Sequence, residues 1–402
     1  MEARRNRFEP NIEELERRKK LIQEKMVEEN ISLIIATAPQ PLTAGYVRYI
    51  SGFAVDFTYI SPNSVLLSAD GETYMITTGN PNNPFNNQQP YILPPTIEPG
   101  VKYLMKDVYY PAVNFSLENE CKLFENTIKH TNAKKVGLVG LANFSNVTMD
   151  YLKSSCTDVE FVDFTEKIDE IKSVKSSIEI EYIKKTIAMM EKIMQAVPSI
   201  LREGIYEWEI GAKLTRLAND LGSENPLVFI TSGKQGTKIS SAPSFYQNRQ
   251  IESEDQIRVE LRMSGPGGYF GSICRDYIFD SEPEDNLSEA VKKATEFQEQ
   301  IISMIKPNTK VSKLQSELNS LINTKNKNGN RFEYKVFGQG YDLVERPLVV
   351  DKEIMDIKQN MVIAVKVFVQ TPNAEVSIID DFLIKDTGNI LLSSIPHTIV
   401  VK

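Results

Sequence analysis

Histidine and cysteine, which often carry nucleophilic or metal chemistry, are scarce in this 402-residue chain. The two histidines, His130 and His397, lie far apart, and Cys121, Cys156 and Cys274 form no Cys-x-x-Cys pair. The sequence therefore predicts no histidine-based triad, no multi-histidine metal site and no disulfide framework. We expect His130 to lie at the surface, whereas His397 is a minor candidate for function.

Charged side chains inside apolar, strand-like runs are the remaining candidates for chemistry. Glu260 and Arg262 alternate with apolar residues in QIRVELRM, so they share one face of a strand. Lys366 lies between Val365 and Val367, and its side chain points away from the face of these two. A lysine in such a place can act as an acid, a base or an anion-binding group, or it can form a structural ion pair. Glu260 and Arg262 can likewise pair with each other or line a pocket.

The first part of the chain alternates helical and strand-like segments. Residues 11–30 have helical periodicity with a charged outer face. Strand-like apolar runs occupy residues 32–39, 63–78, 134–140 and 158–164. The Asp70-Gly71 pair within 63–78 predicts a hairpin. We therefore predict an α/β domain over residues 1–165, with an exposed loop at the Asn- and Pro-rich segment 81–100.

The second part begins with a strongly helix-periodic stretch at 166–200, and a further helix is expected at 287–305. From residue 256 onward, strand-like runs dominate the sequence. This order predicts an α+β domain with an antiparallel sheet over residues 166–402.

Charge and hydropathy restrict the partners. The formal net charge of -8 comes from mixed rather than blocked charges, which disfavours nucleic acid as a partner. No run approaches about 18 uninterrupted apolar residues, so we expect no membrane span. The charged N-terminus does not resemble a signal peptide, and we expect a cytoplasmic protein.

Several segments together resemble the creatinase, prolidase and aminopeptidase P family across nearly the whole chain. These segments occur in the family's order: YVRYISGF, IDEIKSVKSSIEIEYIKKTI, PLVFITSG, VELRMSGPGGYFGSICRDYIF, FGQGYDLVERP, NMVIAVKV and IIDDFLIKDTGNILLS. The resemblance implies a creatinase-like N-terminal α/β domain followed by an α+β pita-bread domain with a curved antiparallel sheet. It also implies a homodimer.

Active peptidases of this family hold two divalent ions on two Asp, one His and two Glu. Carried over residue by residue, these five positions fall on Glu260, Ser272, Gln339, Lys366 and Ile379. Only Glu260 keeps a carboxylate, and the ammonium of Lys366 would repel a divalent ion. We therefore expect no dinuclear metal site and no other cofactor.

The resemblance also suggests which residues form the site. Lys366 would take over the charge of the missing metals and pair with Glu260. The candidate catalytic residues are Glu260, Gln339, Glu345, Arg346 and Lys366. The candidate substrate-binding residues are Arg262, Ser241, Ser272, Tyr269 and Asp380. Ser240 is a weaker candidate, and Arg275 matches a family arginine for which a structural role is expected.

Three functional classes are compatible with this pattern. The first is a metal-independent, creatinase-like hydrolase that cleaves a C–N bond in a small guanidino or amino-acid-derived compound. The second is a non-catalytic relative of the aminopeptidases that binds a peptide or small ligand in the vacated cleft. The third, a lyase or isomerase on the same scaffold, has no positive support in the sequence. In each case we expect a small-molecule or short-peptide ligand.

Overall fold

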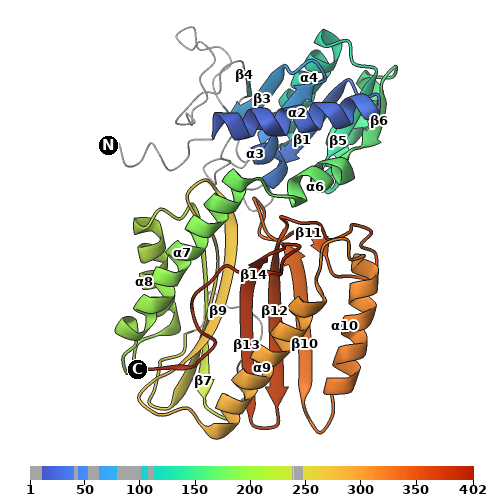
Figure 1. The fold of residues 1–402 in the computed structure, drawn as a ribbon. Coiled ribbons are helices and arrows are strands. Elements are labelled where there is room, and N and C mark those ends of the chain that lie inside the picture. Colours follow the sequence, from blue (N-terminus) through green and yellow to red (C-terminus); the bar gives the residue numbers. More distant parts are fainter. Residues whose placement is uncertain are drawn as a thin grey trace. The chain divides into compact units, whose positions relative to one another are not determined.

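The computed structural model describes residues 11–39, 44–52, 63–78, 101–106, 113–237, 239 and 248–402. The chain divides into two compact units, Met1–Lys172 and Ser173–Lys402 (Figure 1). The sequence suggested a boundary between residues 165 and 166. In the structure the first unit ends at Lys172, because it includes nearly all of helix α6 (Thr165–Ser173). The expected loop 81–100 and residues Ser240 and Ser241 lie outside the described residues.

The first unit contains a mixed six-stranded sheet with the order β4-β3-β2-β1-β5-β6. Its strands are β1 (Leu33–Ala38), β2 (Asn63–Ser68), β3 (Thr73–Thr78), β4 (Val101–Lys106), β5 (Lys135–Val139) and β6 (Glu160–Asp163). Besides α6, its helices are α2 (Ile12–Glu28), α3 (Gly45–Ser51), η2 (Leu141–Asn143), α4 (Val113–His130) and α5 (Asn146–Ser155). The α/β class and the β2–β3 hairpin at Asp70-Gly71 are confirmed.

The second unit contains a nine-stranded, largely antiparallel sheet. Seven strands follow the order β11-β10-β12-β13-β9-β8-β7, while β14 pairs with β13 and β15 pairs with β9. These strands are β7 (Asn225–Lys234), β8 (Asp255–Ser264), β9 (Phe270–Ile278), β10 (Arg331–Gly338), β11 (Glu345–Leu348), β12 (Val362–Thr371), β13 (Ala374–Leu383), β14 (Ile390–Leu391) and β15 (Val400–Val401). Its helices are α7 (Ser177–Ile200), α8 (Glu207–Asp220), α9 (Asp285–Met304) and α10 (Val311–Lys325). The expected antiparallel domain is confirmed.

The periodic stretch 166–200 forms most of α6 and all of α7, with a short non-helical segment at residues 174–176 between them. The side chain of Ser176 accepts a hydrogen bond from the backbone N–H of Glu179, and the Glu179 carboxylate accepts one from the backbone N–H of Ser176. This reciprocal capping starts α7 at a fixed residue.

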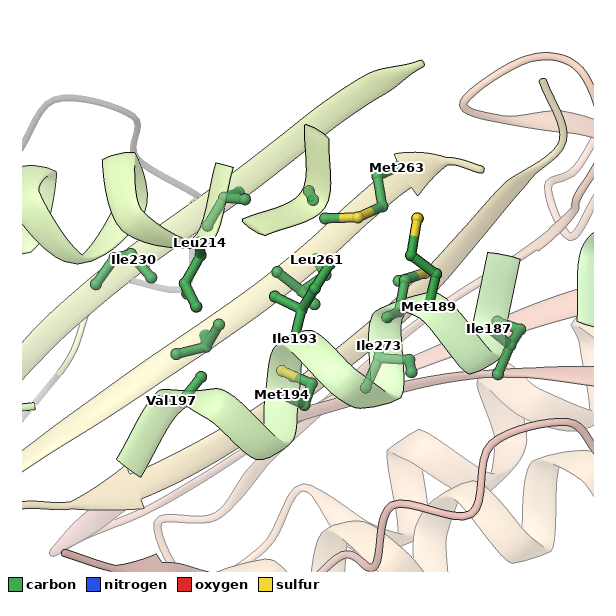
Figure 2. Packing of buried hydrophobic residues seen from close by; sticks show 14 of the residues in the cluster. Ile187, Met189, Ile193, Met194, Val197, Leu214, Ile230, Leu261, Met263 and Ile273 are labelled. Atoms are coloured by element: carbon green, nitrogen blue, oxygen red, sulfur yellow. The ribbon is translucent and has the colours of Figure 1, made fainter. Parts of the chain in front are cut away.

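Helices α7 to α10 of the second unit pack on one face of the sheet. Helices α7 and α8 cover β7, β8 and β9, and Figure 2 shows Ile193 of α7 beside Leu261 of β8. Helices α9 and α10 pack on β10, β12 and β13 through a second apolar cluster. Because strand side chains alternate, the residues between these apolar ones point to the opposite face, here called the inner face. No helix among the described residues is long and apolar enough to cross a bilayer.

Candidate functional site

A row of residues crosses the inner face of the second unit. Strand pairing places Lys366 of β12 opposite Ile379 of β13, Ile379 opposite Cys274 of β9, and Cys274 opposite Glu260 of β8. The alternating neighbours of these residues on β8, Val259 and Leu261, belong to the helix-covered core. The pattern of the sequence therefore placed Glu260 and Lys366 on the correct shared face.

Glu260 and Lys366 form an ion pair across this row. The Nζ atom of Lys366 lies 2.5 Å from Oε2 of Glu260, and the two side chains are 15% and 5% exposed. Strands β12 and β8 are separated by β13 and β9, which corresponds to about 14 Å at ordinary strand spacing. Both long side chains must therefore lean toward each other over Ile379 and Cys274. The expected pairing is present in the structure.

A second group of polar residues lies on the same face. Nε2 of Gln339 donates to Oγ of Ser272 over 2.6 Å and to Oδ1 of Asp381 over 3.2 Å. The backbone N–H of Ser272 donates to Oδ2 of Asp381 over 3.0 Å. Burial raises the pKa of the Asp381 carboxyl to about 7, although these hydrogen bonds favour its charged form. At neutral pH this carboxyl can therefore hold or release a proton.

Arg262 of β8 lies opposite Ser272 of β9 and is the cationic side chain nearest to this polar group in the strand pairing. Its NH2 group donates to the carbonyl of Leu343 over 3.1 Å, and its guanidinium carbon lies 5.2 Å from the centre of the Phe337 ring. Burial lowers the pKa of this guanidinium, whereas the negative charges of Glu260 and Asp381 raise it. Arg262 was expected to pair with Glu260 or to line a pocket, and Glu260 is instead bound by Lys366.

Three buried polar atoms of this group have no hydrogen-bond partner among the described residues. They are Oε1 of Glu260, Oε1 of Gln339 and Nε of Arg262. A buried polar group normally has a partner, because leaving it unpaired costs about 1–3 kcal/mol. Two acceptors and one donor on the same sheet face are therefore available to a polar ligand or to water.

A buried pair on the inner face was missed in the sequence. Nε of Arg258 lies 2.9 Å from Oδ1 of Asp276, and both residues are almost fully buried. Arg258 lies two residues before Glu260 on the same strand, so its side chain points to the same face as Glu260 and Arg262. The alternation of apolar and charged residues could therefore have identified it from the sequence. The two side chains bind each other through two hydrogen bonds, and we assign the pair a structural role.

Glu345 holds a loop rather than facing a ligand. Its Oε2 lies 3.0 Å from Nζ of Lys175, and its Oε1 accepts hydrogen bonds from the backbone N–H groups of Tyr341 and Asp342. A carboxylate with these partners fixes the segment that follows Gln339. The expected catalytic role of Glu345 therefore has no support in this geometry.

Arg346 is also engaged within the fold. Its Nε donates to Oε2 of Glu353 over 3.0 Å. Burial alone would raise the pKa of Glu353, but hydrogen bonds from Arg346 and from the backbone N–H groups of Met355 and Leu348 lower it to about 2. Arg346 thus neutralises a buried carboxylate, which argues against its expected catalytic role.

Tyr269 is buried in an aromatic stack. Its ring stacks on Tyr341 with 4.2 Å between the ring centres, and its hydroxyl donates to Oε1 of Glu179 over 2.9 Å. Only 1% of the residue is exposed. The expected substrate-binding role is therefore not supported, because the side chain is enclosed by the protein.

Asp380 points to the helix-covered face and not to the inner face. It lies 2.6 Å from NH2 of Arg275 and 2.9 Å from Nε2 of His397, and Nε2 of Gln298 in α9 also donates to it. Because neighbouring strand residues alternate, Asp381 occupies the inner face instead. Arg275 has the structural role expected for it, whereas the predicted substrate contact of Asp380 is corrected.

Comparison with known proteins identifies the family. A model of metallopeptidase family M24 matches residues 181–386, and the chain belongs to this family. The Xaa-Pro dipeptidase of Pyrococcus furiosus is 25% identical over 259 residues, which cover 64% of this chain and 73% of that protein.

Solved structures confirm the expected fold. The X-Pro aminopeptidase of Thermotoga maritima matches with a TM-score of 0.78 at 20% identity, covering 96% of this chain and 99% of that one. The N-terminal domain of a FACT complex subunit from chickpea (Cicer arietinum) matches with a TM-score of 0.67 at 14% identity, covering 96% and 97%. The chain therefore has the pita-bread fold that these proteins share.

The five residues that the resemblance assigns to the metal-ligand positions do not fit a pair of divalent ions. Glu260 is bound by an ammonium group, and the fully buried Ile379 offers no donor atom. The hydroxyl of Ser272 and the amide of Gln339 are neutral groups that bond each other. Among the described residues, no three His, Cys, Asp or Glu side chains meet closely enough to hold an ion. Hard divalent ions require more anionic oxygen than this set supplies.

Proposed function

We propose that this chain is a metal-independent, hydrolase-like member of the M24 family. It binds a small amino-acid-derived, guanidino or short-peptide ligand on the inner face and cleaves a C–N bond. The observation that carries the proposal is the ion pair between Lys366 and Glu260, two residues that the family resemblance assigns to metal-ligand positions. Oε1 of Glu260 has no hydrogen-bond partner among the described residues. The Xaa-Pro dipeptidase relative supports hydrolysis of a C–N bond.

The chemistry would need one water and two side chains. Oε1 of Glu260 accepts a proton from water as the water oxygen attacks the carbon of the C–N bond. The Lys366 ammonium stabilises the negative charge that develops on the substrate. The C–N bond then breaks and the proton passes to the leaving nitrogen, so that water is added across the bond.

A specific observation favours a second candidate, a non-catalytic binding protein. Ser272, Gln339 and Asp381 bond one another, and Lys366 already holds one oxygen of Glu260. Side chains held in this way can bind a ligand through their remaining unpaired atoms without reacting with it. The homodimer and the cytoplasmic location stay predictions.

Turnover by chelator-treated protein distinguishes the two candidates. The substrates are guanidinoacetate, N-acetylglycine and alanylproline, each with its carboxamide counterpart, and mass spectrometry detects cleavage of the C–N bond. We expect at least one compound to be cleaved without metal, and Glu260→Gln to reduce the rate about 100-fold or more, since a general base contributes at least this factor.

The control variant is Glu317→Gln, whose side chain on α10 is 46% exposed and remote from the inner-face row. It should keep the wild-type rate. Turnover that requires added manganese, cobalt or zinc would contradict the hydrolase proposal. Binding without cleavage would establish the second candidate in its place.

A further inference from the structure

Arg262 differs from Lys366 and Arg258, two other cations of the inner face, in making no direct ion pair among the described residues. Lys366 is paired with Glu260, and Arg258 is paired with Asp276. Among the described residues, Arg262 makes no ion pair, and its one hydrogen bond is to the carbonyl of Leu343. A partly buried guanidinium that makes no direct ion pair can bind the anionic group of a ligand.

The guanidinium is held in a fixed position. The Leu343 carbonyl accepts a hydrogen bond from its NH2 group, and its guanidinium carbon lies over the Phe337 ring. Cation–π contact and one hydrogen bond restrict an otherwise flexible side chain. The Nε donor is buried and has no partner among the described residues. The guanidinium is therefore already oriented, with a donor available, before a ligand binds.

We infer that Arg262 binds a carboxylate of the ligand, and that this site therefore accepts small carboxylic acids rather than their neutral amides. The inference rests on the proposed function, because it concerns the ligand of the same site. A carboxylate matches the guanidinium best, since two parallel N–H···O bonds can form between the two planar groups.

The neighbouring acceptors describe the rest of the ligand. Oε1 of Glu260 and Oε1 of Gln339 are both buried and unpaired, and both need N–H donors. Glu260 and Arg262 are two residues apart on β8, so their Cα atoms lie about 7 Å apart. The ligand thus carries an N–H group within a few bonds of its carboxylate, as amino-acid derivatives do.

Matched acid and amide pairs test this inference. Isothermal titration calorimetry of the full chain would compare guanidinoacetate, N-acetylglycine and alanylproline with their three carboxamides. For every skeleton that binds, we expect the acid to bind at least ten-fold more tightly than the amide. In Arg262→Gln the preference should disappear, and Arg262→Lys should restore part of it, because a lysine keeps the charge but not the fork.

The control variant Arg216→Gln removes an arginine whose side chain is 85% exposed on α8, and it should keep the full acid preference. Thermal unfolding of each variant verifies that it is folded, and Arg262→Lys serves as the test if Arg262→Gln is not. The inference is overturned if amides bind as tightly as acids, if no acid binds at millimolar concentration, or if the folded Arg262 variants keep the full preference. Acid-selective binding without turnover would instead remove the hydrolase proposal and leave the role of Arg262 intact.

Discussion

Replacing Lys366 with methionine is expected to lower the free energy of unfolding by about 3–5 kcal/mol, because it leaves the carboxylate of Glu260 buried without its partner. Nζ of Lys366 lies 2.5 Å from Oε2 of Glu260, and the Glu260 side chain is only 5% exposed. Methionine keeps much of the length of the lysine stem, so the loss would report the charge rather than a large cavity. Urea unfolding followed by circular dichroism measures it.

A double-mutant cycle isolates the pair. Adding Glu260→Gln to Lys366→Met should recover part of the loss, since both charges are then absent, with a coupling energy of about 1–3 kcal/mol. The control is Lys184→Met, whose ion pair with Glu181 on α7 is largely exposed and should matter little. Equal stabilities of Lys366→Met and the wild type would show that the ion pair does not form.

Replacing Arg275 with methionine should cost a similar amount, about 3–5 kcal/mol, for a different reason. Asp380 is fully buried on the helix-covered face, and Arg275 is its main cationic partner at 2.6 Å. Gln298 and His397 would remain, but one is neutral and the other is charged only when protonated. Thermal unfolding measures the effect.

His397→Gln serves as the comparison for this second prediction. The His397 side chain is 16% exposed and contributes one of several bonds to Asp380, so its replacement should cost clearly less than that of Arg275. A larger loss for His397→Gln than for Arg275→Met would mean that the imidazole, and not the guanidinium, neutralises Asp380.

Alternation along strands allowed much of the inner face to be predicted from the sequence. It placed Glu260, Arg262 and Lys366 on the correct face, because apolar neighbours on both sides pack against helices. The same rule, applied from Ile379, would have selected Asp381. Asp380 was predicted to bind substrate, but it lies on the opposite side of the sheet from Asp381.

Other roles depended on contacts that a sequence does not show. In the sequence, Glu345 and Arg346 appear as unpaired charges. In the structure, Glu345 pairs with Lys175, which is far away in the sequence, and Arg346 pairs with Glu353, seven residues further along the chain. Helix α10 (Val311–Lys325) was not predicted, although Leu314 and Leu318 form an apolar stripe at helical spacing. Burial and ion pairing, rather than residue type, determine which charged side chains still have atoms that can bind a ligand.

The metal content of the purified protein tests the central claim most directly. The full chain would be expressed with manganese, cobalt and zinc in the medium, desalted, and measured by inductively coupled plasma mass spectrometry. The ammonium group of Lys366 is bound to Glu260 and would repel a divalent ion at this site. We therefore predict far less than one equivalent of these metals per chain. Two tightly bound equivalents, lost together with binding or turnover on chelation, would contradict the account.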